Sequence, residues 1–251
     1  MYERLYNHAI VKIDAERAHR LALRGLSAAQ SIPGGLRALE RYAPEPDERM
    51  RLRVWDLPFA NPLGVAAGLD KDGDAVEALH ALGFGHVEVG TITLRPQPGN
   101  DRPRIWRVPK QSAVINAMGF PSSGAASVRA RLITLRAKGV VGVNIGKNRD
   151  TPIDRAADDY AGLIATLFPI ANYITINISS PNTPDLRSLQ MADELAHLLA
   201  TVGDANDQAA ALARRDPKPL LIKIAPDLTD AEIEGVADAA LATGARGIVA
   251  T

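Results

Sequence analysis

The 251 residues contain 46% hydrophobic and 23% charged side chains, which suits one α/β barrel or two small domains with a full core. The 29 basic and 29 acidic residues cancel, so no overall field favours nucleic acid, and we expect no nucleic-acid partner. There is no cysteine, which excludes disulfides, thiolate metal sites and a cysteine base, and which fits a reducing compartment. No signal peptide and no membrane-spanning segment is predicted.

The first part of the chain predicts a small helical domain. Small and apolar residues recur at three- and four-residue steps between Ala18 and Ala29, and Asp14 is placed to cap that helix. A shorter helix is expected around Leu36–Tyr42, before an extended stretch that starts at Leu52. We place a boundary near Pro46 and predict two domains, over residues 1–46 and 47–251.

The second part repeats a strand that ends in a polar residue, followed by a helix that ends at glycine. The six predicted strands cover residues 63–67, 86–90, 140–144, 173–177, 220–223 and 247–251. Thr229 and Glu232 form a capping box, and Thr151 with Pro152 is expected to open another helix. Alternating strands and helices predict a parallel sheet, either an open doubly wound sheet or a (β/α)8 TIM-type barrel.

The polar residues at the strand ends favour the barrel, because they would form a ring around one central site. They are Lys71, Thr91, Asn144, Asn177, Lys223 and Thr251. A polar residue often ends a strand simply because a loop begins there, so each is ambiguous alone. About six of eight βα units are present, so we expect an incomplete barrel that lacks the last two.

Three segments carry candidate chemistry. Residues 67–71 (AGLDK) combine a glycine, which lets a flat ligand approach the backbone, with a lysine. Residues 116–120 (NAMGF) lie in a long insertion that follows an alternating stretch, 103–109, which could be a plain hairpin. Residues 177–183 (NISSPNT) form the densest polar cluster, more than a turn requires, and its asparagines suit a planar ligand with carbonyl and ring NH groups.

Together with residues 144–147 (NIGK) and 222–226 (IKIAP), these segments resemble dihydroorotate dehydrogenase in order and approximate spacing. The resemblance covers the whole chain. The predicted helical domain over residues 1–46, here called the prelude, contains the segment 14–19 (DAERAH). It resembles the N-terminal domain of the quinone-dependent class 2 enzymes. Serine at position 180 agrees, because class 2 enzymes use serine as base where class 1 enzymes use cysteine.

The resemblance implies oxidation of dihydroorotate to orotate in pyrimidine biosynthesis, with Ser180 as catalytic base and one non-covalent FMN per chain as hydride acceptor. The implied substrate-binding residues are Lys71, Asn116, Ala117, Met118, Gly119, Phe120, Asn177 and Asn182. The implied FMN-binding residues are Ala67, Gly68, Leu69, Asp70, Lys71, Thr91, Asn144, Asn177, Lys223 and Thr251. Because a serine hydroxyl is a weak base, a water path flanked by Phe120 and Thr183 is expected to carry its proton away.

The resemblance also implies a membrane quinone as final electron acceptor, with His19 and Arg107 near its tunnel. The helical prelude would then place a monomeric enzyme peripherally on the cytoplasmic face of the inner membrane. Alternatively, the prelude merely clasps the barrel. No metal site is expected.

Two features set limits on this interpretation. The family usually has arginine where this chain has Ala117, and the family's phosphate-gripping loops belong to the two missing units. We therefore expect the 251 residues alone to bind FMN poorly or to aggregate, and to be inactive. A non-catalytic flavin- or pyrimidine-binding barrel and a phosphate-binding isomerase or aldolase are alternatives. The latter needs a histidine or glutamate base, and alternation with Val87 and Val89 places Glu88 on the other face.

Overall fold

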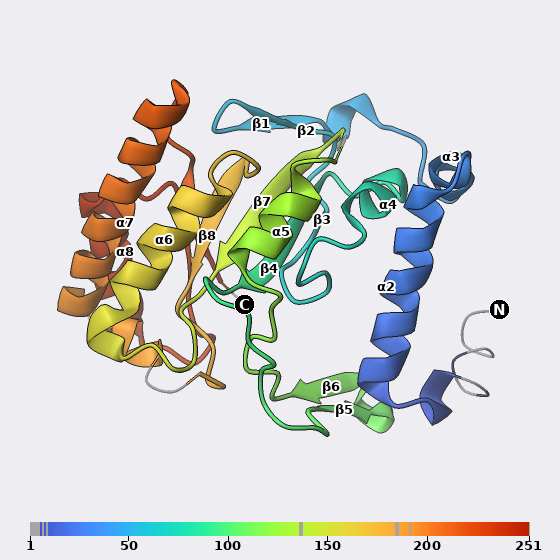
Figure 1. Ribbon diagram of the computed structural model, residues 1–251, viewed down its shortest axis with the longest axis horizontal. Coiled ribbons are helices and arrows are strands. Elements are labelled where there is room, and N and C mark those ends of the chain that lie inside the picture. The colour runs from blue at the N-terminus through green and yellow to red at the C-terminus, as the bar shows by residue number, and fades with distance from the viewer. Residues whose placement is uncertain are drawn as a thin grey trace.

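The computed structural model describes Tyr6, His8 and residues 10–135, 138–183, 186–190 and 192–250. Six parallel strands form one curled sheet in the centre of the molecule (Figure 1). They are β3 (Gly64–Val65), β4 (His86–Ile92), β7 (Val140–Ile145), β8 (Tyr173–Asn177), β9 (Leu220–Lys223) and β10 (Gly247–Val249). Their order, β10-β9-β8-β7-β4-β3, follows the chain without a reversal. A doubly wound sheet would reverse at a switch point, so the winding confirms the expected partial barrel.

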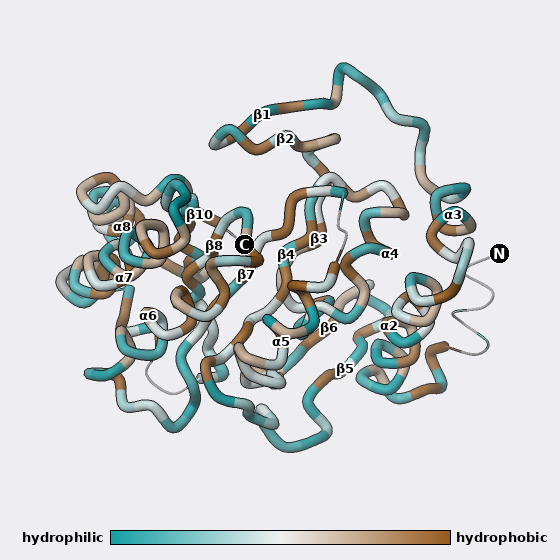
Figure 2. The backbone as a smooth tube through the Cα atoms, turned by 45° about the horizontal axis from the view of Figure 1, so that its top comes forward, coloured by the Kyte–Doolittle hydropathy of each residue, from teal (hydrophilic) through white to brown (hydrophobic). Residues whose placement is uncertain are grey.

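Helices cover the outer face of this sheet. The barrel helices are α4 (Val76–Ala81), α5 (Ala125–Leu132), α6 (Ala156–Leu167), α7 (Ala192–Ala213) and α8 (Asp230–Ala242). Short 3-10 turns, η4 (Ile153–Arg155) and η5 (Leu186–Gln190), precede α6 and α7. Because helices cover one face and the curl closes over the other, every residue of β7 and β8 is buried. In Figure 2 brown, hydrophobic residues recur along the central strand β4, which is buried from its second residue to its last.

Of the two predicted helix starts, the one at Thr229 is confirmed and the one at Thr151 is wrong. Thr229 and Glu232 form the capping box of α8, and Gly244 adopts the left-handed conformation just beyond it. Thr151 does not cap a helix. Its hydroxyl donates to the buried carboxylate of Asp159 at 2.7 Å, and η4 separates it from α6.

Two hairpins lie at opposite ends of the strands. The hairpin of β1 (Leu52–Val54) and β2 (Leu57–Phe59), preceded by η2 (Glu48–Met50), packs where the strands begin. There Phe59 contacts His86, the first residue of β4, and Trp55 contacts Tyr173, the first residue of β8. The hairpin of β5 (Ile105–Val108) and β6 (Ala113–Asn116), joined by η3 (Pro109–Gln111), belongs to the opposite, carboxyl end, as its contribution to the pocket below shows.

The helical prelude consists of η1 (Ile10–Lys12), α2 (Ala15–Ser31) and α3 (Gly35–Glu40). Asp14 caps α2 by accepting a hydrogen bond from the backbone N–H of Arg17, as predicted. Figure 1 shows α2 running alongside the barrel from α4 down to the β5–β6 hairpin. None of the described helices is long and apolar enough to cross a membrane.

Candidate functional site

A pocket of about 340 Å³ lies at the carboxyl ends of the strands, between the sheet, the β5–β6 hairpin and α2. Its lining includes most of the residues that the sequence singled out. They are Ala67, Gly68, Lys71, Thr91, Asn116, Met118, Gly119, Phe120, Asn177, Ser180, Asn182 and Lys223. Residues from five separate segments therefore meet in one cavity, at the end of the barrel where such folds carry out their chemistry.

Four other predicted residues lie outside the lining, and Thr251 lies outside the described residues. Asp70 is fully buried, and its carboxylate accepts the backbone N–H groups of Asp74 and Ala75, both at 2.8 Å. It thereby shapes the loop that carries Lys71, and burial raises its pKa. Leu69 and Ala117 neighbour lining residues, and Asn144 lies buried behind the lining residues Thr91 and Asn177.

Ser180 lies in the loop that follows β8, directly on the pocket. Its Oγ accepts a hydrogen bond from the backbone N–H of Asn182 at 3.2 Å. A donor of this kind stabilises negative charge on the oxygen when the hydroxyl loses its proton. The neighbouring Ser179 instead turns to Asn177, whose Oδ1 accepts from the Ser179 hydroxyl at 2.9 Å. Of the two serines, Ser180 is therefore the one that lines the pocket.

Two lysines give the pocket positive charge. Lys71 and Lys223 both line it, and neither forms a hydrogen bond or ion pair through its ammonium group with any residue that the structure describes. Burial lowers the pKa of Lys71 from 10.5, and the charges of Arg104 and Lys223 lower it further, while the charges of Asp72 and Glu16 offset part of this shift. Two cations without carboxylate partners favour an anionic or electron-rich ligand.

A buried polar network lies beneath the pocket. The hydroxyl of Thr91 donates to Asn144 Oδ1 at 2.7 Å, and Asn177 Nδ2 donates to the same oxygen at 3.0 Å. Asn144 Nδ2 in turn donates to Glu88 Oε1 at 2.8 Å. These side chains come from β4, β7 and β8, so the network ties three adjacent strands together.

The prediction for Glu88 was wrong. Both Glu88 and Thr91 contact Asn144, so both point into the barrel, although simple alternation separates them. The reason is a register shift in the pairing of β4 with β7 between Val89 and Ile92, which adds one residue and returns Thr91 to the inner face. Glu88 remains away from the pocket lining.

The prelude is fastened to the loops around the pocket by a buried ion pair. Glu16 on α2 accepts hydrogen bonds from Arg102 at 3.0 and 2.8 Å and from Arg104 at 3.1 and 2.8 Å. The hydrogen bond from Arg104 is the main cause that lowers the pKa of Glu16 from 4.5 to about 2. Arg107 donates to the backbone oxygen of Ile13 at 2.6 Å, and His19 Nε2 lies 2.6 Å from the backbone oxygen of Leu69.

His19, Ile105 and Val114 line the pocket, although the sequence did not predict the last two. The alternation of residues 103–109 indicated one strand of the hairpin. It did not identify the second strand, β6, on which Val114 lies.

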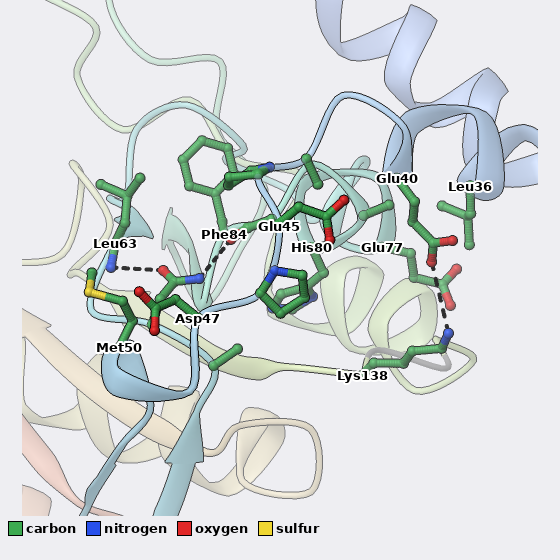
Figure 3. A pocket seen from close by; sticks show the side chains of 17 residues that line it. Leu36, Glu40, Glu45, Asp47, Met50, Leu63, Glu77, His80, Phe84 and Lys138 are labelled. Atoms are coloured by element: carbon green, nitrogen blue, oxygen red, sulfur yellow. Dashed lines mark hydrogen bonds and ion pairs between the residues drawn. The ribbon is translucent and has the colours of Figure 1, made fainter.

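A larger pocket of about 810 Å³ lies at the other end of the barrel (Figure 3). It is bounded by α3, the segment 43–50 and α4, and Lys138 approaches Glu40 across it to 4.0 Å. Its lining is mostly apolar and contains none of the predicted site residues. Among the described residues, no group of three or more histidine or carboxylate side chains could hold a metal ion.

Comparison with known proteins links this arrangement to one family. The family model described as dihydroorotate dehydrogenase matches residues 49–251. A protein from Acidithiobacillus ferrooxidans named dihydroorotate dehydrogenase (quinone) is 49% identical over 242 residues, covering 95% of this chain and 67% of that relative. The equally named protein of Burkholderia thailandensis is 48% identical over 254 residues, covering 100% of this chain and 72% of the relative.

A solved structure has the same fold. The crystal structure of DHODH from Eimeria tenella in complex with ferulenol matches with a TM-score of 0.82 and 37% identity, over 95% of this chain and 66% of that one. The chain thus spans about two thirds of the length of the proteins that it matches.

Proposed function

The chain belongs to the dihydroorotate dehydrogenase family, and we propose that it oxidises dihydroorotate to orotate with a flavin, FMN, as hydride acceptor and a quinone as final electron acceptor. The observation that carries this proposal is the position of Ser180. It shares one pocket with the asparagines and the two lysines that a carboxylated pyrimidine and a flavin would need.

Ser180 acts as the base that removes a proton from the substrate. The Asn182 N–H, which donates to Ser180 Oγ at 3.2 Å, stabilises the charge that develops on that oxygen. The proton needs an exit, since no histidine forms a hydrogen bond with Ser180 in the described part of the chain. Thr183 indicates a route for the proton, because its Oγ1 is buried and has no hydrogen-bond partner among the described residues. Such an atom is normally satisfied by water, so a water path beside Thr183 and Phe120 takes the proton.

The substrate is held by the segment 116–120 together with Lys71, Asn177 and Asn182. Lys71 attracts the substrate carboxylate, and the asparagine amides pair with the ring amides. Ala117, whose place is taken by arginine in most of the family, contributes its backbone: its N–H donates to Arg104 O, and its oxygen accepts from Asn100 Nδ2. The loop is therefore held by hydrogen bonds that do not need an arginine at this position.

The residues of the pocket also fit a flavin. When bound, FMN supplies the two-electron acceptor chemistry that no amino-acid side chain provides. Ala67–Lys71, Thr91, Asn177 and Lys223 would hold it, with Asn144 behind them and Thr251 beyond the described residues. Lys223 has no carboxylate partner in the described structure, so its charge is available to offset negative charge on the flavin ring.

Residues 1–46 form a separate functional unit that receives the quinone, and residues 47–251 form the flavin-binding barrel. Supporting this, α2 reaches the flavin pocket through His19, and Arg107 holds Ile13 at the start of the prelude. We place the enzyme peripherally on the cytoplasmic face of the inner membrane, as a monomer anchored by these helices.

Anaerobic reduction tests the reaction. Because the 251 residues alone are expected to bind FMN poorly, the test uses flavin-loaded protein with a complete barrel, which includes the two βα units absent from these residues. It is mixed with dihydroorotate without oxygen or quinone, and its flavin absorbance is followed. Loss of the absorbance with formation of one orotate per flavin is expected. A flavin that dithionite bleaches but dihydroorotate does not would refute the proposed substrate. Removing residues 1–46 is expected to leave this half-reaction intact and to abolish quinone reduction.

A further inference from the structure

Glu88 is a buried carboxylate that the proposed mechanism does not use. It lies on β4 beneath the pocket, 7% exposed, and it accepts three hydrogen bonds, one from the neighbouring strand β7 and two from β8, the next strand beyond it. We propose that Glu88 is a positioning residue that sets the direction of the Asn144 and Asn177 amides at the floor of the pocket. This inference rests on the proposed flavin site, because Asn177, at the end of this chain of amides, lines the pocket that would hold the flavin.

The three partners leave Glu88 only the role of acceptor. Asn144 Nδ2 donates to Oε1 at 2.8 Å, and the hydroxyls of Tyr173 and Thr175 donate to Oε2, both at 3.0 Å. Burial, together with the charge of Glu88, raises the pKa of Tyr173, so its hydroxyl stays protonated and donates. An ionised carboxylate has no hydrogen to give, whereas an amide has both a donor and an acceptor end. Glu88 therefore distinguishes the two ends of the Asn144 amide.

The orientation of the Asn144 amide in turn fixes the orientation of the next amide toward the pocket. With its Nδ2 committed to Glu88, Asn144 presents Oδ1 to Thr91 at 2.7 Å and to Asn177 at 3.0 Å. Asn177 must meet that oxygen with its own Nδ2, which also donates to Thr91 Oγ1 at 2.9 Å. The Asn177 Oδ1 is left to accept from the backbone N–H and hydroxyl of Ser179, at 3.2 and 2.9 Å.

Without an obligatory acceptor at position 88 this order is lost. A glutamine there can offer its NH2 group to Asn144, which must then turn its oxygen toward residue 88. The Asn144 NH2 would face the Asn177 NH2, and Asn177 would have to turn as well. Because Thr91 and Asn177 line the pocket, the reversal changes which donors and acceptors a ring ligand meets. Glu88 thus governs recognition without touching the ligand.

An exchange of the two side chains tests the proposal. In Glu88→Gln the direction is lost, and in Asn144→Asp two carboxylates face each other. In the double variant, the new glutamine accepts from Tyr173 and Thr175 through its oxygen and donates to the new aspartate through its NH2 group. That aspartate, in place of Asn144, accepts from Thr91 and Asn177. Every partner is satisfied again, in the original direction.

The first readout is flavin affinity, measured by titrating apoprotein with FMN and following the quenching of flavin fluorescence. Each single variant is expected to raise the FMN dissociation constant about tenfold or more, and the double variant to recover most of this loss. Wild-type affinity in Glu88→Gln, or a double variant no better than the single ones, would overturn the proposal.

Thr175→Val is the matched control. It removes a donor to Glu88 Oε2 but leaves the Asn144 bond to Oε1 in place. It is expected to lower the urea midpoint of unfolding while keeping the FMN dissociation constant of the wild type. If Glu88 were merely structural, Thr175→Val and Glu88→Gln would weaken flavin binding in proportion to their loss of stability.

The urea midpoints separate this inference from the proposed function. All FMN titrations use protein with the complete barrel. If the wild type in that form binds no FMN at all, the proposed flavin site fails. The direction of the hydrogen bonds in the network is then judged from urea unfolding, where the double variant should again be more stable than either single variant. If the double variant instead loses the sum of the stabilities lost by the two single variants, the proposed direction is refuted.

Discussion

Arg104 binds Glu16 through two hydrogen bonds of 3.1 and 2.8 Å, and both side chains are almost fully buried. The same guanidinium donates to the backbone oxygens of Pro98 and Asn100 at 2.6 and 2.8 Å. Asn100 in turn holds Ala117 in the predicted substrate loop. The ion pair between Arg104 and Glu16 therefore connects the N-terminal helix with the loop that lines the pocket.

Replacing Glu16 by glutamine is expected to loosen this connection. The variant leaves two arginines without their counter-charge, one of them buried, and should lower the free energy of unfolding by about 3 kcal/mol. Urea unfolding measures the loss, and limited proteolysis should cleave first near α2. Glu48→Gln is the control, because its ion pair with Arg51 is exposed and should matter by less than about 1 kcal/mol. Equal effects of the two variants would contradict the role of the ion pair.

The same carboxylate predicts a dependence of stability on pH. The pKa of Glu16 falls from 4.5 to about 2 in the folded protein. Its contribution is therefore complete above pH 4.5 and is lost as the pH falls from 4.5 toward 2, amounting to about 3 kcal/mol. The difference in stability between wild type and Glu16→Gln should shrink across this window. Parallel pH profiles of the two proteins would show that Glu16 is not the group responsible.

Lys71 predicts that orotate binding weakens at alkaline pH. Burial lowers its pKa below 10.5, so the lysine loses its proton, and with it the attraction for a carboxylate, at a lower pH than an exposed lysine. Titration of the flavin-loaded protein with orotate between pH 7 and 10 should show affinity falling as the pH rises. Lys71→Met should bind weakly at every pH, whereas the exposed Lys138→Met should titrate like the wild type. A Lys71→Met profile as steep as that of the wild type would refute this assignment.

We expect a side chain at position 142 to disturb the packing of the barrel interior. A Cβ at this position would overlap the ring of Tyr173, whose hydroxyl binds Glu88. Gly142→Ala should therefore destabilise the protein by about 1–3 kcal/mol and disturb the network above it. Gly203→Ala is the control, since nothing lies within 4 Å of a Cβ there and alanine favours a helix. A Gly142→Ala variant as stable as Gly203→Ala would show that the ring has room to move.

The sequence predicted the strands of the barrel well, because buried parallel strands are short runs of β-branched residues with clear ends. Residues 173–177 and 220–223 are strands β8 and β9 without correction. The pairing of β5 with β6 was left open, because half of that hairpin is exposed and its pattern is weak. The direction of Glu88 was missed because the register shift after Val89 follows from contact with β7, which the local pattern of β4 does not reveal.

The polar site could be predicted as far as residue types and strand ends determine it. Ser180, Asn177 and Lys71 do meet in one pocket, since parallel strands bring their carboxyl ends together. The link from α2 through Glu16 and His19 could not be predicted, because it depends on how a helix packs against loops about 50 to 90 residues away in sequence.

Ser180→Ala in the anaerobic half-reaction tests the central claim most directly. Stopped-flow mixing of the flavin-loaded variant with dihydroorotate should show flavin reduction slowed by about 100- to 10,000-fold, the usual contribution of a general base. Ser179→Ala, which removes the neighbouring hydroxyl that donates to Asn177 Oδ1 and is not part of the pocket lining, should be affected far less. Flavin reduction in Ser180→Ala at the rate of the wild type would contradict the assignment of Ser180 as the base.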